Sequence, residues 1–172
     1  LEDYRPDMAG SEYFATHAVK EKTNFFPVGL YKYSTLLKEK NKKGILISCG
    51  LGGEEEEITR DAIKQIIEKD LRPPEKLYVE PRILPEKYPD WMVKAPFTSE
   101  MFHDCVAVCI RPGIGTISDA LVHHARIYAF SRDESYEMLH NCEILEQLKV
   151  GERCDSPFDA YCKAIEFASS KE

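Results

Sequence analysis

The 172-residue sequence lacks the features of several protein classes. It has no apolar run of transmembrane length, and no signal-peptide pattern opens it. Its formal net charge of -7 gives no surplus of Lys and Arg, which nonspecific binding to nucleic acid or to an anionic membrane would need. We therefore predict a cytoplasmic protein with no transmembrane segment and no nucleic-acid partner.

The sequence also lacks the cysteine spacing of a metal or redox site. Its six cysteines form no CxxC pair, and three of them lie in or beside apolar runs. Zinc ligands usually occur at short, regular spacings, so reduced core thiols are a better interpretation than zinc ligands or disulfides. We predict neither a metal site nor a cofactor.

Apolar and amphipathic segments alternate from Gly44 onward. The pattern predicts strands at 44–49, 76–83, 91–95, 105–110 and 126–130, and helices at 55–69, 98–103, 116–125, 135–148 and 157–169. Such alternation is typical of an α/β fold, here a Rossmann-like, doubly wound parallel sheet with helices on both faces.

Residues 1–43 differ from the rest in being polar and irregular, with a candidate helix at 34–42. We interpret them as a linker or interdomain segment that precedes one domain at 44–172. The sequence opens with Leu1 rather than Met, which favours a segment of a longer protein or a processed product.

The most informative segment is Cys105–Asp119, CVAVCIRPGIGTISD. Val and Ile dominate its first six residues, as in a parallel strand that is covered on both faces. Gly113 and Gly115 are expected to permit positive φ and a close backbone approach. The helix predicted from Thr116 would direct N–H groups and its positive dipole end at an anion. The sequence therefore indicates a phosphate-binding turn.

A second glycine-rich turn follows another apolar strand, in Gly44–Gly53, GILISCGLGG. Two such turns at the carboxyl ends of parallel strands would face one crevice, which is where open α/β sheets bind ligands. A tight turn without a ligand is the alternative at either place. The acidic run Glu54–Glu57 is expected to stabilise the N-terminus of the following helix.

The order of these motifs over residues 44–150 resembles the carboxyl-terminal, nucleotide-sugar-binding half of a GT-B glycosyltransferase. The resemblance is strongest to the bacterial peptidoglycan N-acetylglucosaminyltransferase family. Arg111-Pro-Gly-Ile-Gly-Thr-Ile-Ser-Asp119 is similar to that family's Arg-Ser-Gly-Ala-x-Thr-x-x-Glu pattern. The resemblance implies a diphosphate held by Gly113, Ile114, Gly115 and Thr116, and ribose hydroxyls held by Asp119. Arg111 suits either the diphosphate or a helix carboxylate.

Three further segments resemble the same family in the same order. The loop with Gly50, Gly52 and Gly53 resembles its glycine loop near the diphosphate. Phe97-Thr-Ser-Glu-Met101 is similar to its Phe-x-Asp-Asp-Met segment, which flanks uracil, although Phe97 is equally compatible with a core position. Ser135–Asn141 resembles a region that touches the donor sugar, and this implies a contact from Glu137 or Asn141.

The resemblance implies metal-independent transfer of a sugar from a nucleotide diphosphate, with UDP the expected nucleotide, to an acceptor hydroxyl. N–H groups and the helix dipole near Thr116 would stabilise the departing diphosphate. In the family the general base normally belongs to the amino-terminal domain, for which the sequence shows no counterpart. We therefore interpret the chain as the donor-binding half of a hexosyltransferase. It would be inactive alone and dependent on an acceptor domain or a separate acceptor-binding subunit.

Other interpretations stay open from the sequence. The chain could be a standalone donor-binding subunit, a non-catalytic nucleotide-binding module or half of a nucleotide-sugar epimerase. Its histidines do not separate these functions: His123 is compatible with the core and His124 with the surface, and neither has a nearby partner for nucleophilic catalysis.

Overall fold

The computed structural model describes residues 13–15, 25–27, 42–50, 53–132 and 136–170. The chain divides into two units, Leu1–Tyr33 and Ser34–Glu172. The first contains two short strands, β1 (Tyr13–Ala15) and β2 (Phe25–Pro27), which pair in parallel. Most of the candidate helix at 34–42, together with Gly52, lies outside the described residues.

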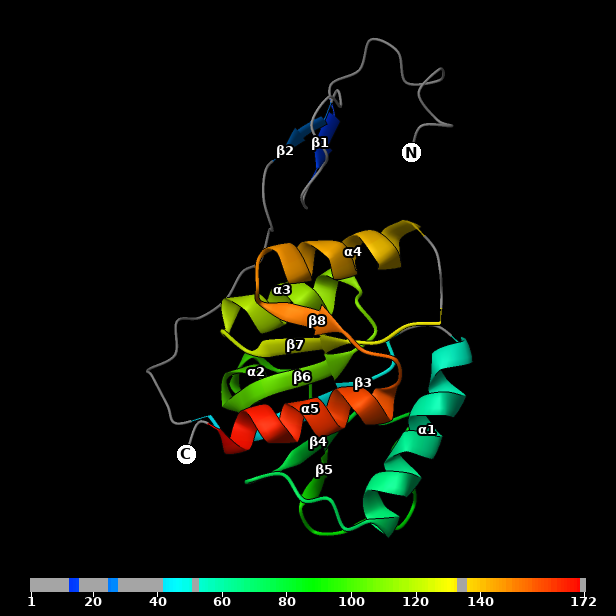
Figure 1. The fold of residues 1–172 in the computed structure, drawn as a ribbon. Helices are drawn as coiled ribbons and strands as arrows, with labels where there is room; N and C mark the ends of the chain where they lie inside the picture. The colour runs from blue at the N-terminus through cyan, green and yellow to red at the C-terminus, as the bar shows by residue number, and fades with distance from the viewer. Residues whose placement is uncertain (1–12, 16–24, 28–41, 51–52, 133–135, 171–172) are drawn as a thin grey trace. The chain divides into compact units, whose positions relative to one another are not determined.

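The second unit is a parallel sheet with helices on both faces (Figure 1). Its strands are β3 (Gly44–Ser48), β4 (Leu77–Val79), β5 (Met92–Lys94), β6 (Cys105–Ile110), β7 (Arg126–Ala129) and β8 (Gly151–Arg153). Its helices are α1 (Gly53–Glu68), α2 (Ser99–Asp104), α3 (Ile114–Val122), α4 (Tyr136–Gln147) and α5 (Pro157–Ser169). Every neighbouring pair of these strands is parallel, which confirms the predicted α/β, Rossmann-like class.

The strand order places the two glycine turns side by side. The order is β5-β4-β3-β6-β7-β8, so the direction of winding reverses between β3 and β6. In open α/β sheets this reversal leaves a crevice at the carboxyl ends of the two strands, and ligands bind there. The N–H of Arg111, just after β6, donates to the carbonyl oxygen of Ser48 at the end of β3 over 3.2 Å.

Alternate residues of the central strands pack on opposite faces. Ile45 and Ile47 lie in a core cluster with residues of α1 and α5, whereas Leu46 lies in a second cluster with residues of α2, α3 and α4. All residues of β3 and β6 are buried, since helices cover both faces. This explains why both strands read as continuous apolar runs.

The edge strand β8 was not predicted. Its three residues, Gly151-Glu-Arg, carry little apolar signal, and only β7 pairs with it in the described sheet. A Cβ added at Gly151 would lie 2.5 Å from the carbonyl oxygen of Ile127, so glycine permits the close approach of these strands. Helix α3 also begins earlier than predicted, at Ile114 instead of Thr116.

All six cysteines are free thiols, and five of them are buried. Within the described ranges, no helix combines the length and the apolar character that would be needed to cross a membrane.

Candidate functional site

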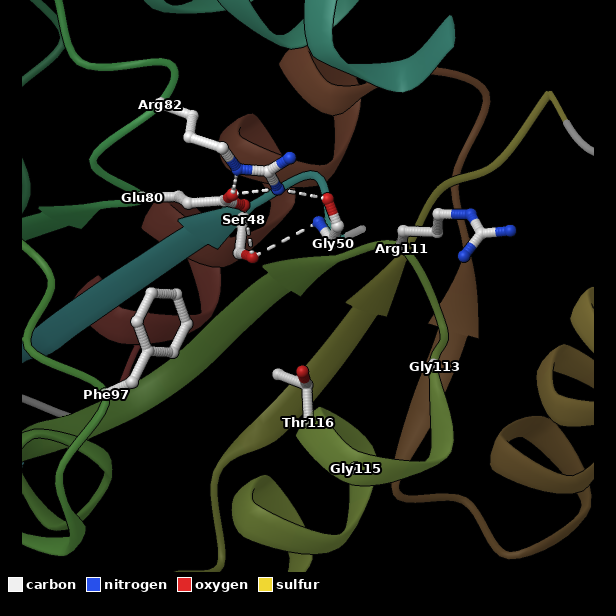
Figure 2. A pocket seen from close by; sticks show the side chains of 9 residues that line it. All are labelled: Ser48, Gly50, Glu80, Arg82, Phe97, Arg111, Gly113, Gly115 and Thr116. Carbon is white, nitrogen blue, oxygen red and sulfur yellow. Dashed lines mark hydrogen bonds and ion pairs between the residues drawn. The ribbon is translucent and has the colours of Figure 1, made fainter. Parts of the chain in front are cut away.

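A cavity of about 370 Å³ lies at the switch point of the sheet, where β3, β4 and β6 end (Figure 2). Figure 2 shows Phe97 on one side of it and Arg111 on the other, with Thr116 between them. The two glycine turns and Phe97, predicted separately, therefore meet in one pocket. Its lining comprises Ser48, Gly50, Glu80, Arg82, Phe97, Arg111, Gly113, Gly115 and Thr116.

The glycine turn after β6 leads directly into α3. Gly113 is the N-cap of this helix, with φ -74° and ψ 137°, and Gly115 lies in its first turn. The N–H groups of a helix's first turn have no carbonyl partner within the helix and favour anions. Because Gly115 and Thr116 belong to this turn and line the pocket, the helix N-terminus faces the cavity.

The expected positive φ at Gly113 and Gly115 is wrong. Gly113 is extended and Gly115 is helical, because α3 begins two residues earlier than predicted. The described glycine with positive φ is Gly50, at 67°. What Gly113 and Gly115 supply is space, since a Cβ added at either would meet no atom within 4 Å.

The turn is supported from α4. Asn141 is buried, and its Nδ2 donates to the carbonyl oxygen of Pro112 over 2.7 Å. The resemblance implied a sugar contact for Asn141, whereas this bond gives it a supporting place behind the glycine turn.

The turn after β3 is organised by two residues that the sequence did not single out. Glu80 is 5% exposed and accepts hydrogen bonds from Ser48 Oγ at 2.8 Å and from the N–H of Cys49 at 3.0 Å. Arg82 donates to Glu80 through Nε at 2.6 Å and to the carbonyl oxygen of Gly50 through Nη2. One signal could have revealed them, namely a carboxylate directly after the apolar strand Leu77–Val79, at the edge where such sheets bind ligands.

The thiol of Cys49 lies beside this carboxylate. Burial, followed by the negative charge of Glu80, raises the pKa of Cys49 to about 12. Since the thiolate is the reactive form, Cys49 is a neutral group near pH 7 and not a nucleophile.

A second carboxylate is buried behind Arg111. Glu55 on α1 is 3% exposed, accepts a hydrogen bond from Ser131 Oγ at 2.9 Å and lies 3.7 Å from Arg111 Nε. The acidic run therefore does more than stabilise the start of α1, since one of its members pairs with Arg111. In both pairs, Glu55 with Arg111 and Glu80 with Arg82, the carboxylate is buried and the arginine is the more exposed partner.

Phe97 has an unusual backbone. Its φ is 52°, and its side chain is 42% exposed although it is a large apolar group. Non-glycine residues in the left-handed region are uncommon and cluster at functional sites. Met101, in contrast, is buried in the core with Phe102, and its N–H donates to Thr98 Oγ1, which caps α2.

The other predicted site residues that the structure describes are not among those that line the pocket. Asp119 is half-buried on α3, one turn beyond Thr116 and outside the described lining, and Ile114 is the half-buried first residue of that helix. Glu137 is exposed in the first turn of α4, and Gly53 begins α1. Among the described residues, no group of three or more His, Cys, Asp or Glu side chains could hold a metal ion.

Comparisons with known proteins identify the fold. No protein-family model matches the chain, and no curated protein matches it. The glycotransferase of kitacinnamycin is similar in structure, with 15% identity and a TM-score of 0.64 over 89% of this chain and 43% of its own. Spinosyn forosaminyltransferase SpnP gives 15% identity and a TM-score of 0.62, over 88% and 45%.

The glycosyltransferase SnogD from Streptomyces nogalater gives 13% identity and a TM-score of 0.56, over 98% of this chain and 56% of its own. The chain thus spans about half the length of these structures. At such low identity the likeness is one of fold. This chain has an α/β, Rossmann-like fold that is similar to part of these glycosyltransferase structures.

Proposed function

We propose that the chain is the donor-binding half of a GT-B glycosyltransferase and that its pocket binds a nucleotide diphosphate sugar, with UDP as the nucleotide. One observation carries the proposal: a helix N-terminus, Arg111 and an exposed aromatic ring meet in one cavity at the topological switch point. These groups suit the different parts of such a donor.

The diphosphate is assigned to the N-terminus of α3. The open space at Gly113 and Gly115 lets phosphate oxygens approach the backbone closely, and Thr116 adds a hydroxyl. Arg111 lies at the same edge, and its planar guanidinium suits phosphate. The buried Glu55 partly neutralises Arg111 and holds it beside the turn.

The base is assigned to Phe97, across the pocket from Arg111 in Figure 2. Its exposed ring offers a stacking face, and the left-handed backbone at Phe97 holds that ring at the pocket. Asp119, one turn beyond Thr116, is assigned to the ribose hydroxyls, as the resemblance implied.

The chemistry proposed for this half is stabilisation of a leaving group. Negative charge develops on the diphosphate as the glycosidic bond breaks, and fixed N–H groups and the α3 dipole would offset it without reorganising. An acceptor-binding domain or subunit would supply the general base. The motif resemblance to the peptidoglycan N-acetylglucosaminyltransferase family supports a hexose donor.

A calorimetric panel tests the proposal. The folded chain is titrated with UDP, GDP and dTDP and with the corresponding nucleotide sugars, and we expect UDP and a UDP-sugar to bind most tightly. Binding of none of these ligands would contradict the proposal. Conversion of free nucleotide sugar without any acceptor would point instead to an epimerase.

A further inference from the structure

A closed ring of hydrogen bonds surrounds the end of β3. Ser48 Oγ donates to Glu80 Oε2 over 2.8 Å, and the N–H of Gly50 donates to Ser48 Oγ over 3.4 Å. Arg82 completes the ring by donating to Glu80 Oε1 and to the carbonyl oxygen of Gly50. The ring therefore engages both backbone polar groups of Gly50, as Figure 2 shows.

The ring acts on a residue with a special backbone. Gly50 has a φ of 67°, in the left-handed region that disfavours residues with a Cβ. A Cβ added at Gly50 would lie 3.6 Å from Cβ of Arg111, which is ordinary van der Waals contact. Glycine is thus required here for its conformation and not for space.

Glu80 holds Arg82 in the orientation that the ring needs. The carboxylate is buried, and its two oxygens accept from Ser48, from Cys49 and from Arg82. Arg82 is 41% exposed and also lies 3.7 Å from Glu56 of α1. A long side chain with such exposure is ordinarily free to change rotamer, and the charge-assisted pair with Glu80 restricts it.

We infer that Ser48, Glu80 and Arg82 are positioning residues that hold Gly50 in its left-handed conformation and so preorganise the first glycine turn for a nucleotide diphosphate. The nature of the ligand rests on the function proposed above. The mechanical part of the inference does not.

Amide hydrogen exchange of Gly50 tests the mechanical part without ligand. We expect faster exchange of the Gly50 N–H in Arg82→Ala and in the milder variants Glu80→Gln and Ser48→Ala, while core amides of β6 keep their protection. Arg72→Ala is the matched control, because Arg72 makes a similar pair with Asp70, two residues away, outside the pocket. Unchanged Gly50 exchange in the three ring variants would overturn the inference.

A double-mutant cycle tests whether Arg82 acts through Gly50. We expect Arg82→Ala and Gly50→Ala each to lower the affinity for UDP roughly tenfold, which is in the range for a hydrogen bond to a charged group. The double variant should bind UDP only slightly more weakly than either single variant. A roughly hundredfold loss in the double variant would show that Arg82 binds the ligand independently, and would overturn the positioning role. If the parent chain binds no nucleotide diphosphate, the proposed function fails, and the exchange experiment still decides the role of the ring.

Discussion

The side-chain amide of Asn141 donates a hydrogen bond of 2.7 Å to the carbonyl oxygen of Pro112. Asn141 is on α4, and Pro112 belongs to the turn between β6 and α3, so the bond joins a helix to the turn that opens the pocket. Both groups are buried, so water cannot easily replace the amide.

Asn141→Ala is therefore expected to lower the free energy of unfolding by about 1–3 kcal/mol, because it leaves a buried carbonyl without its donor. We also expect weaker UDP binding, because the turn before α3 loses its support. Urea denaturation and calorimetry measure the two effects. Gln147→Ala, which removes an exposed amide at the end of the same helix, is the control and should change neither quantity.

The sequence predicted the fold because each central strand is buried on both faces. The apolar runs at 44–47 and 105–110 are the direct consequence of helices packed on both sides. Strand β8 was not predicted because Gly151-Glu-Arg is short and polar. Its pairing depends on a close approach to Ile127, which the periodicity of the sequence does not reveal.

The site was predicted only in part, for a similar reason. Glycine turns after apolar strands carry a local signal, and Phe97 was predicted from the motif resemblance. Gly50, Phe97 and Gly113 line the pocket, and their roles in binding stay predictions. The bonds of Glu80 to Ser48 and Cys49, and the pair of Glu55 with Arg111, join residues more than 30 positions apart. Such contacts follow from the order of strands and not from a motif.

Gly115→Val is predicted to abolish UDP binding in a folded chain. A Cβ at Gly115 meets no atom within 4 Å, so the side chain would occupy pocket volume without a clash inside the protein. Valine has a somewhat better helix propensity than glycine, so the substitution in the first turn of α3 should leave the helix intact. Calorimetry measures binding, and Gly115→Ala should give an intermediate loss. A Gly115→Val chain that binds UDP normally would place the phosphates elsewhere.

Asp119→Ala tests the ribose contact. If the carboxylate accepts hydrogen bonds from ribose hydroxyls, its loss should weaken UDP by about 1.5–3 kcal/mol and leave the fold intact. Asp61→Ala on α1 is the control, because Asp61 is an exposed carboxylate paired with Lys64. Unchanged UDP affinity in a folded Asp119→Ala chain would show that the carboxylate does not contact the ribose.

His123 is predicted to make stability depend on pH. It is 5% exposed, its ring is stacked with Phe102 at 6.4 Å and in edge contact with His103 at 6.0 Å. Burial, followed by the charge of His103, lowers the pKa of His123 below its ordinary 6.5. Below pH 6.5 the unfolded chain therefore binds more protons than the folded chain, and stability falls as the pH decreases.

Through His123 alone, the free energy of unfolding changes by at most about 1.4 kcal/mol per pH unit. Urea unfolding at several values between about pH 7.5 and pH 5.5 measures it, and His123→Leu should flatten the curve in that window. His124→Asn is the control, since His124 is exposed and asparagine tolerates its φ of 52°. Identical curves for the parent chain and His123→Leu would show that His123 does not contribute.

The isolated chain is predicted to bind the donor and to transfer nothing. The groups that meet in the pocket are assigned above to the nucleotide and the diphosphate alone. Holding a second substrate in line with the first is worth roughly 7–11 kcal/mol of a reaction barrier. A domain that positions only one substrate cannot lower the barrier in this way.

The measurement incubates the purified chain with labelled UDP-sugars and a broad pool of acceptor alcohols, after UDP binding has been confirmed in the same preparation. Glycoside formation by this chain alone would show that an acceptor site and its general base lie within these 172 residues, and the half-enzyme assignment would be wrong.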